Sequence, residues 1–163
     1  EDGQTNVSQA LNLGTLYCGL GRPDDALAAI GTLGQMSPYG KLVESQVRLR
    51  AALQKGDRRK ANSVLNFIRR NSDESPTLLL DALMHAGLVA EAADMVGYLL
   101  ESNDRRADIL DWLQQYRTSD PLPGDREYIR NIDILRERDD VRAAVDKVGR
   151  IERHGIYGAY GFE

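Results

Sequence analysis

Three glycines lie within eight residues near the start of the chain, at Gly14, Gly19 and Gly21. Such clusters can bind a nucleotide phosphate, because backbone N–H groups can approach the anion closely. The stretch GTLYCG has the glycine spacing of a P-loop, but Leu20 and Gly21 follow it where Lys and Ser or Thr are required. The stretch GLGRPD begins like a dinucleotide fingerprint, yet Asp24 replaces the final glycine and would repel a pyrophosphate. The glycines therefore do not predict a nucleotide site, and we expect no cofactor.

The ionisable side chains offer one candidate pair, Asp81 and His85, four residues apart on a predicted helix. At this spacing Asp81 could orient a catalytic imidazole. Because no nucleophile accompanies the pair, we favour the interpretation that both side chains are simply exposed. Cys18, the single cysteine, is expected to be a packed apolar side chain, since no His near it in sequence could activate it. No HExxH motif or zinc-type Cys/His spacing is present, so we expect neither a metal site nor an enzyme.

The composition suits a soluble globular domain, with 163 residues of which 42% are hydrophobic and 28% charged. No apolar run is long enough to span a membrane, and no signal-peptide pattern opens the sequence. Because the first residue is Glu and not Met, we expect an excised domain or a processed product. The compartment, cytoplasmic or periplasmic, stays open.

The charge is unevenly distributed along the chain. Residues 41–70 contain nine Lys or Arg against two acids, a net of +7, so the other residues carry −11 of the total of −4. Arg58, Arg59 and Lys60 open a predicted helix, where cations are unfavourable for the helix dipole. This basic patch could bind an anionic partner, or it could be a solvated face balanced by acidic helices, which we favour. Net acidity and few aromatic residues argue against nucleic acid.

The sequence predicts an almost entirely helical chain, because β-branched residues never alternate over the length of a strand. Gly21, Gly56 and Gly87 each stand between two apolar-periodic runs, as glycines do where helices end. Pro23 stands where a helix begins, a position at which proline costs nothing. The predicted helices span about 6–19, 23–34, 39–54, 58–71, 77–86, 89–102, 105–117, 125–137 and 140–152.

One sequence unit recurs three times when the chain is aligned on Gly21, Gly56 and Gly87. An alanine follows each glycine by five residues, and two aliphatic residues follow the alanine. The alanines, which we call the repeat alanines, are Ala26, Ala61 and Ala92, and the aliphatic pairs are Ile30 and Leu33, Leu65 and Ile68, and Val96 and Leu99. Each unit is a helical hairpin that cannot bury its apolar face alone, so neighbouring units must stack.

This unit resembles the tetratricopeptide repeat, a helix–turn–helix of 34 residues. The first copy, about 7–40, has Leu13, Gly14, Tyr17, Gly21, Ala26, Ile30 and Pro38 at the family's spacings. Two degenerate copies follow at about 42–75 and 73–106, then irregular helices at 105–152 and an aromatic, glycine-spaced tail at 154–163. The resemblance implies one domain over residues 1–163, an all-α solenoid of about four antiparallel hairpins in a right-handed superhelix. The tail could cap the last hairpin, or dock on a partner or a second copy.

In this family the first helix of each hairpin lines a concave groove. The groove positions carried over from the family are Leu11, Thr15, Cys18, Gln46, Arg50, Leu53, Gln54, Asp81, Met84 and His85. The Lys and Asn set that grips C-terminal carboxylates in chaperone co-factors of the family is not reproduced. This mixed polar and apolar set predicts a non-catalytic scaffold that binds a protein, as a peptide or a partner helix. A regulatory or substrate-presenting domain of a bacterial export or envelope assembly, for polysaccharide or secretion, is the alternative.

Overall fold

The protein is described by a computed structural model that covers residues 6–117 and 120–157. Within these residues the chain is mostly helical, consistent with the all-α class, with nine helices and one pair of short strands. The helices are α1 (Val7–Gly19), α2 (Pro23–Ala29), α3 (Pro38–Gln54), α4 (Arg58–Arg70), α5 (Pro76–His85), α6 (Val89–Glu101), α7 (Arg106–Leu113), α8 (Arg126–Glu137) and α9 (Asp139–Asp146). The strands are β1 (Gln115–Arg117) and β2 (Arg153–Tyr157). None of these helices is long and apolar enough to cross a membrane.

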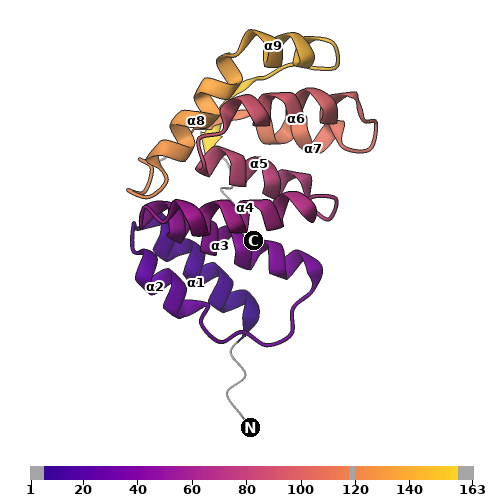
Figure 1. The fold of residues 1–163 in the computed structure, drawn as a ribbon. Coiled ribbons are helices and arrows are strands. Elements are labelled where there is room, and N and C mark those ends of the chain that lie inside the picture. Colours follow the sequence, from indigo (N-terminus) through magenta and orange to yellow (C-terminus); the bar gives the residue numbers. More distant parts are fainter. Residues whose placement is uncertain (1–5, 118–119, 158–163) are drawn as a thin grey trace.

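The helices pack largely in chain order. Helix α1 packs on α2 and α3, α3 on α4 and α5, and α5 on α6. Figure 1 shows this progression from α1 and α2 at one end of the molecule to α8 and α9 at the other. Helix α8 departs from the order, because it packs across both α5 and α6. The loop before α8 therefore has to run back toward the earlier helices.

The turns after α1, α3 and α5 have one conformation. Gly21, Gly56 and Gly87 all have φ of 71°, in the left-handed region that glycine adopts without strain. In each turn the N–H groups of the glycine and of the residue after it donate to carbonyl oxygens of the preceding helix, with N···O distances of 2.8 to 3.2 Å. This is the hydrogen-bond pattern of a Schellman motif. The prediction that these three glycines end helices is confirmed.

Replacing Gly56 by alanine should isolate the cost of this backbone conformation. A Cβ at Gly56 would meet nothing within 4 Å, so the expected loss of about 1–2 kcal/mol in the free energy of unfolding is backbone strain alone. The matched control is Gly97→Ala inside α6, where a Cβ also meets nothing. This change should raise the free energy of unfolding by up to about 1 kcal/mol. Urea denaturation of both variants measures the two effects, and changes of the same sign would contradict the explanation.

The core is built at the repeated positions. The three repeat alanines are at most 3% exposed, and small side chains at these positions let paired helices approach closely. Gly14 likewise lets α1 lie close to the end of α2 and to α3, since a Cβ on Gly14 would lie 3.0 Å from both Ile30 Cγ2 and Val47 Cγ1. The buried apolar side chains form a smaller cluster from α1 to α3 and a larger one from α3 to α9.

Three predicted helices are longer than the observed ones. Helix α2 ends at Ala29 and not near residue 34, and α9 ends at Asp146 and not near residue 152. Helix α7 ends at Leu113, because Arg136 of α8 binds the carbonyl oxygens at its end. Arg136 Nε donates to the Leu113 oxygen at 2.9 Å and Nη2 to the Gln114 oxygen at 2.6 Å. The chain then continues as β1 where helix was predicted.

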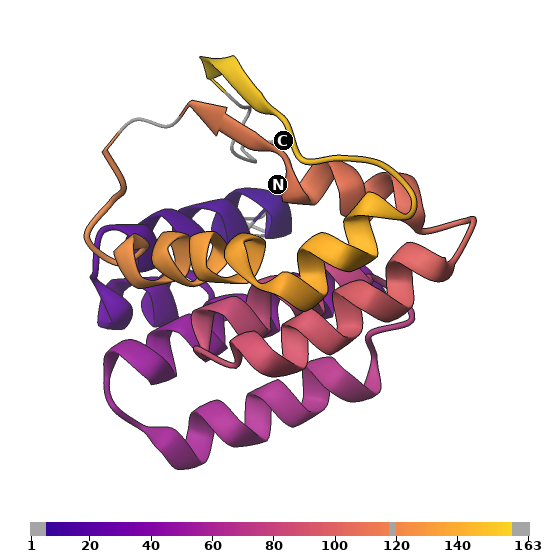
Figure 2. The same ribbon diagram turned by 90° about the horizontal axis from the view of Figure 1, so that it is seen from above.

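The strands β1 and β2 pair in parallel, with Gln115 opposite Arg153 and Tyr116 opposite His154. Figure 2 shows the two strands together at one edge of the molecule, outside the helices. No alternation of apolar and polar residues in the sequence predicts these strands. Strand β2 includes the start of the tail at 154–163, whose residues 158–163 lie outside the described residues.

Candidate functional site

The predicted groove residues lie on α1, α3 and α5. We call the surface formed by the side chains of Thr15, Gln46, Arg50, Gln54, Asp81 and His85 the α1/α3/α5 face. These residues form one surface because α1 packs on α3 and α3 packs on α5. Part of this surface is covered by the chain itself. The covering residues are the loop 120–125, which we call the strap, and the first turns of α8. Figure 1 shows this loop and the start of α8 reaching toward the ends of the earlier helices.

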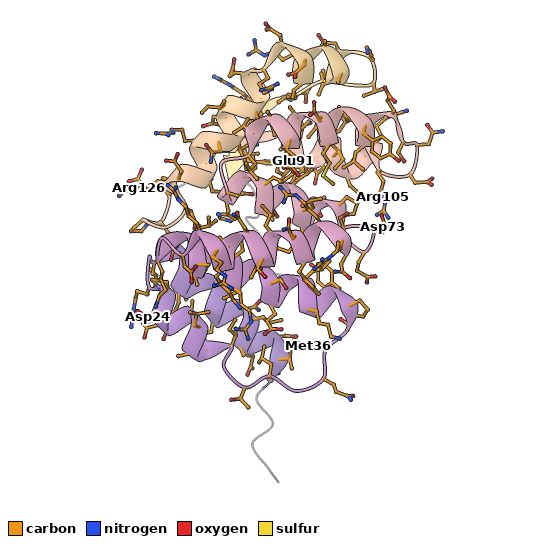
Figure 3. The ribbon with its side chains drawn as sticks, viewed as in Figure 1. Asp24, Met36, Asp73, Glu91, Arg105 and Arg126 are labelled. Atoms are coloured by element: carbon orange, nitrogen blue, oxygen red, sulfur yellow. The ribbon has the colours of Figure 1, made fainter. Side chains whose placement is uncertain are left out.

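The strap is attached to α1 and α3 by two polar contacts. The Gly124 N–H donates to the Gly19 carbonyl oxygen at 2.8 Å. Asp125 pairs with Arg50, whose side chain is largely buried on α3. Burial raises the pKa of the Asp125 carboxyl, and the positive charge of Arg50 opposes this shift. Arg126, labelled in Figure 3, marks the point at which the strap gives way to α8.

Two glycines allow the strap to lie close to α1. A Cβ on Gly19 would lie 2.8 Å from Leu122 Cδ1. A Cβ on Gly124 would overlap the Cys18 carbonyl oxygen. The repeat pattern does not require a glycine at position 19, and the strap supplies the reason for it.

Cys18 is a core residue, as the sequence predicts. Its side chain is 0% exposed, and Sγ lies 3.6 Å from the Val47 carbonyl oxygen. Burial raises the pKa of the thiol, although the nearby Arg50 charge opposes the shift. The Cys18 carbonyl oxygen accepts a hydrogen bond from Gln54 Nε2 at 2.7 Å, which links α1 to α3 beside the strap.

Asp81 and His85 lie under residues of α7 and α8. The Tyr128 hydroxyl donates to Asp81 Oδ1 at 2.6 Å, and Trp112 Nε1 donates to the same oxygen at 3.1 Å. The His85 ring stacks on Tyr128 with 4.3 Å between ring centroids. The interpretation that Asp81 and His85 are exposed is therefore wrong, because both are half-buried beneath these side chains.

The pKa values at this position follow from burial. Burial raises the pKa of the Asp81 carboxyl, while the hydrogen bonds from Tyr128 and Trp112 and the Arg50 charge act in the opposite direction. Burial lowers the pKa of His85 well below its ordinary value, and the Arg50 charge lowers it further. His85 is therefore neutral at pH 7.

The lowered pKa of His85 predicts a loss of stability in mild acid. As the pH falls below about 6.5 the unfolded chain binds a proton at His85 before the folded chain does, which costs up to about 1.4 kcal/mol per pH unit. His85→Phe keeps a ring against Tyr128 but cannot titrate, so its stability should vary less between about pH 7 and pH 5.5. Urea denaturation at both pH values gives the change in the free energy of unfolding with pH for the wild-type chain and for the variant. Asp81 and Asp125 titrate in both proteins, so an equal change in the two would show that His85 is not responsible for the loss of stability.

The other predicted groove residues are distributed between the face and the core. Gln46 Nε2 donates to the Leu78 carbonyl oxygen and so links α3 to α5. Met84 is fully buried, and its carbonyl oxygen accepts a hydrogen bond from Asn131 Nδ2 at 2.8 Å. The remaining three are Leu11, which is buried, and Leu53 and Thr15, which are half-buried.

Four residues of this site were not predicted. They are Trp112 of α7, Asp125 at the end of the strap, and Tyr128 and Asn131 of α8. The spacing of Asp125, Tyr128 and Asn131, three residues apart, places them on one side of a helix. That periodicity was available in the sequence, but it did not indicate which surface they would meet.

The predicted basic patch lies on α4. Arg58, Arg59 and Lys60 are all exposed in its first turn, and the Asp57 side chain caps the helix by accepting from the Lys60 N–H at 2.9 Å. In the part of the chain that the structure describes, no carboxylate forms an ion pair with these three side chains.

Comparison with known proteins identifies no relative of this chain. No family model, no curated protein and no solved structure matches the chain. Among residues 6–117 and 120–157, no three His, Cys, Asp or Glu side chains are grouped so that they could hold a metal ion.

Proposed function

We propose that this protein is a non-catalytic interaction domain, a tetratricopeptide-like solenoid whose α1/α3/α5 face binds an extended peptide or a partner helix. The observation that carries this proposal is the path of residues 120–131. Along the face, this segment is first a loop that ends in a turn, in which the Asp125 N–H donates to the Leu122 carbonyl oxygen at 2.9 Å, and then a helix. The face therefore lies against both a non-helical segment and a helix of the same chain.

The repeated construction of the chain supports the solenoid. The three turn glycines share one φ value of 71°, and the three repeat alanines are all buried. A stack of similar hairpins aligns its first helices side by side, which produces a continuous surface for an elongated partner. The contacts to residues 120–131 are hydrogen bonds, an ion pair and a ring stack, which are the contacts that peptide ligands use.

Selection from a displayed library of random peptides against the immobilised chain tests this proposal. We expect selected peptides to bind the purified chain, and Thr15→Trp to weaken their binding about tenfold by placing a bulky side chain on the face. Ser63→Trp, on the exposed side of α4, is the matched control and should leave binding unchanged. Selected peptides that respond equally to both variants would place binding elsewhere on the molecule.

The basic patch supports a second candidate function, binding of an anionic protein surface. Arg58, Arg59 and Lys60 are exposed without ion pairs to described residues, so their charges are available to a partner. If this function holds, an acidic peptide such as poly-Glu should bind at about 50 mM salt, and Arg58→Glu combined with Arg59→Glu should abolish binding. If the double variant bound the acidic peptide as tightly as the wild-type chain, the basic patch would not be the binding site. The alternative of an export or envelope assembly stays a prediction from the sequence.

A further inference from the structure

The strap is held by few contacts. Its residues Pro121, Leu122 and Pro123 are exposed. Apart from the close approach at Gly19, it is fixed to the α1/α3/α5 face by the backbone hydrogen bond of Gly124 and the ion pair of Asp125. A segment with so little buried surface can leave its position at low free-energy cost.

Two polar atoms on α3 lack partners among the described residues. They are Arg50 Nε and Gln46 Oε1, and both are buried. The residues are 9% and 8% exposed, respectively. They stand one helical turn apart on the same side of α3, one a donor and the other an acceptor. An unpaired buried donor or acceptor is unfavourable, so this part of the face is incompletely satisfied in the folded chain.

The ion pair of Arg50 uses fewer donor atoms than that of Arg69. Arg69 donates through both Nε and Nη2 to the two carboxylate oxygens of Glu91, at 2.8 and 2.6 Å. Glu91 is labelled on α6 in Figure 3. Asp125 instead accepts from Arg50 only through Nη2. A carboxylate placed side-on against Arg50 would bond Nε as well, which is the stronger geometry.

We propose that the α1/α3/α5 face binds an acidic peptide segment that displaces the strap. A side-chain carboxylate of the peptide bonds Arg50 through Nε and Nη2, and a backbone N–H of the peptide donates to Gln46 Oε1. The strap passes Arg50 with the chain continuing on both sides, so the acidic residue that binds here lies within a segment and need not end a chain. This inference rests on the proposed function and names the chemical class of its partner.

The test uses a peptide with the sequence of residues 120–126 and the full chain carrying Gly124→Ala. The added methyl group overlaps the Cys18 carbonyl oxygen and lifts the internal strap, whereas the peptide keeps its glycine and can take the vacated position. We expect the fluorescently labelled peptide to bind this variant at least about tenfold more tightly than the wild-type chain. Far-UV circular dichroism establishes that the variant is folded.

Two further changes test the carboxylate–guanidinium pair. Arg50→Lys, added to Gly124→Ala, keeps the positive charge but removes the fork of donors, and should weaken peptide binding about tenfold. A peptide with asparagine in place of its Asp125 should bind the Gly124→Ala variant about tenfold more weakly than the original peptide does. Adding Arg50→Lys to that variant should then reduce the affinity of the asparagine peptide only a little further. This coupling is a readout that a general loosening of the fold would not produce.

Three results of the peptide experiments would overturn the inference. The first is equal binding of the peptide to the wild-type chain and to Gly124→Ala, and the second is no binding to Gly124→Ala at about 1 mM peptide. The third is independent effects of the aspartate and of Arg50. Library-selected peptides that bind the face but carry no acidic residue would also overturn it, while leaving the proposed function intact. If no selected peptide is sensitive to Thr15→Trp, the proposed function itself fails.

Discussion

Leu83→Ala is expected to lower the free energy of unfolding by about 2–5 kcal/mol. Leu83 is 1% exposed on α5 and belongs to the larger apolar cluster. Its truncation removes buried methyl groups and leaves a cavity that the surrounding helices fill only in part. In the second copy of the repeat, the equivalent residue is already an alanine, Ala52, which is also buried. Alanine at this position should therefore be tolerated in the second copy and strongly destabilising in the third, because each copy packs against different neighbours.

Leu88→Ala is the matched control, since Leu88 is 37% exposed at the start of α6. A leucine with that exposure should lose about 0.5 kcal/mol or less on truncation. Urea denaturation followed by far-UV circular dichroism compares both variants with the wild-type chain. Similar losses in the two variants would mean that Leu83 is not a core residue.

Tyr128→Phe is expected to cost about 1.5–3 kcal/mol, because it removes a hydrogen bond to a half-buried carboxyl group. The hydroxyl donates to Asp81 Oδ1 at 2.6 Å, the shorter of the two bonds to that oxygen. The phenylalanine ring can still stack on His85, so the change tests the hydroxyl and not the ring. Without this donor the pKa of Asp81 should rise further above its ordinary value.

Tyr98→Phe provides the comparison for Tyr128→Phe. Tyr98 is 74% exposed on α6, so the loss of its hydroxyl should change the free energy of unfolding by less than about 0.5 kcal/mol. Thermal and urea denaturation of the two variants give the difference. If Tyr128→Phe were as stable as Tyr98→Phe, the bond to Asp81 would contribute nothing to the attachment of α8.

The starts of α2, α3 and α5 and the ends of α1, α3 and α5 could be predicted, because they depend on local signals. Proline occupies the first position of α2, α3 and α5, and a left-handed glycine follows α1, α3 and α5. Each signal acts within a few residues of itself. The strands β1 and β2 have only three and five residues. Their existence depends on a partner far along the chain, so no local pattern indicated them.

The candidate site was predicted only in part. The repeat spacing places Gln46 and Arg50 on α3 and Asp81 on α5, because helical periodicity fixes which residues share a face. Periodicity cannot specify the path of a loop in space. The cover of that face by residues 120–131, and hence the burial of Asp81 and His85, depends on tertiary packing that the sequence pattern does not encode.

The parallel pair of strands has a consequence for the order of folding. The helical hairpins at the start of the chain join residues close in sequence, whereas Gln115 and Arg153 are 38 residues apart. Closing the longer loop costs more chain entropy, and contacts of high sequence separation form late. We therefore expect the early hairpins to assemble first and the strands to pair later. The ion pair of the strap joins Arg50 and Asp125, which are 75 residues apart, so the strap should dock last, on a surface that has already formed.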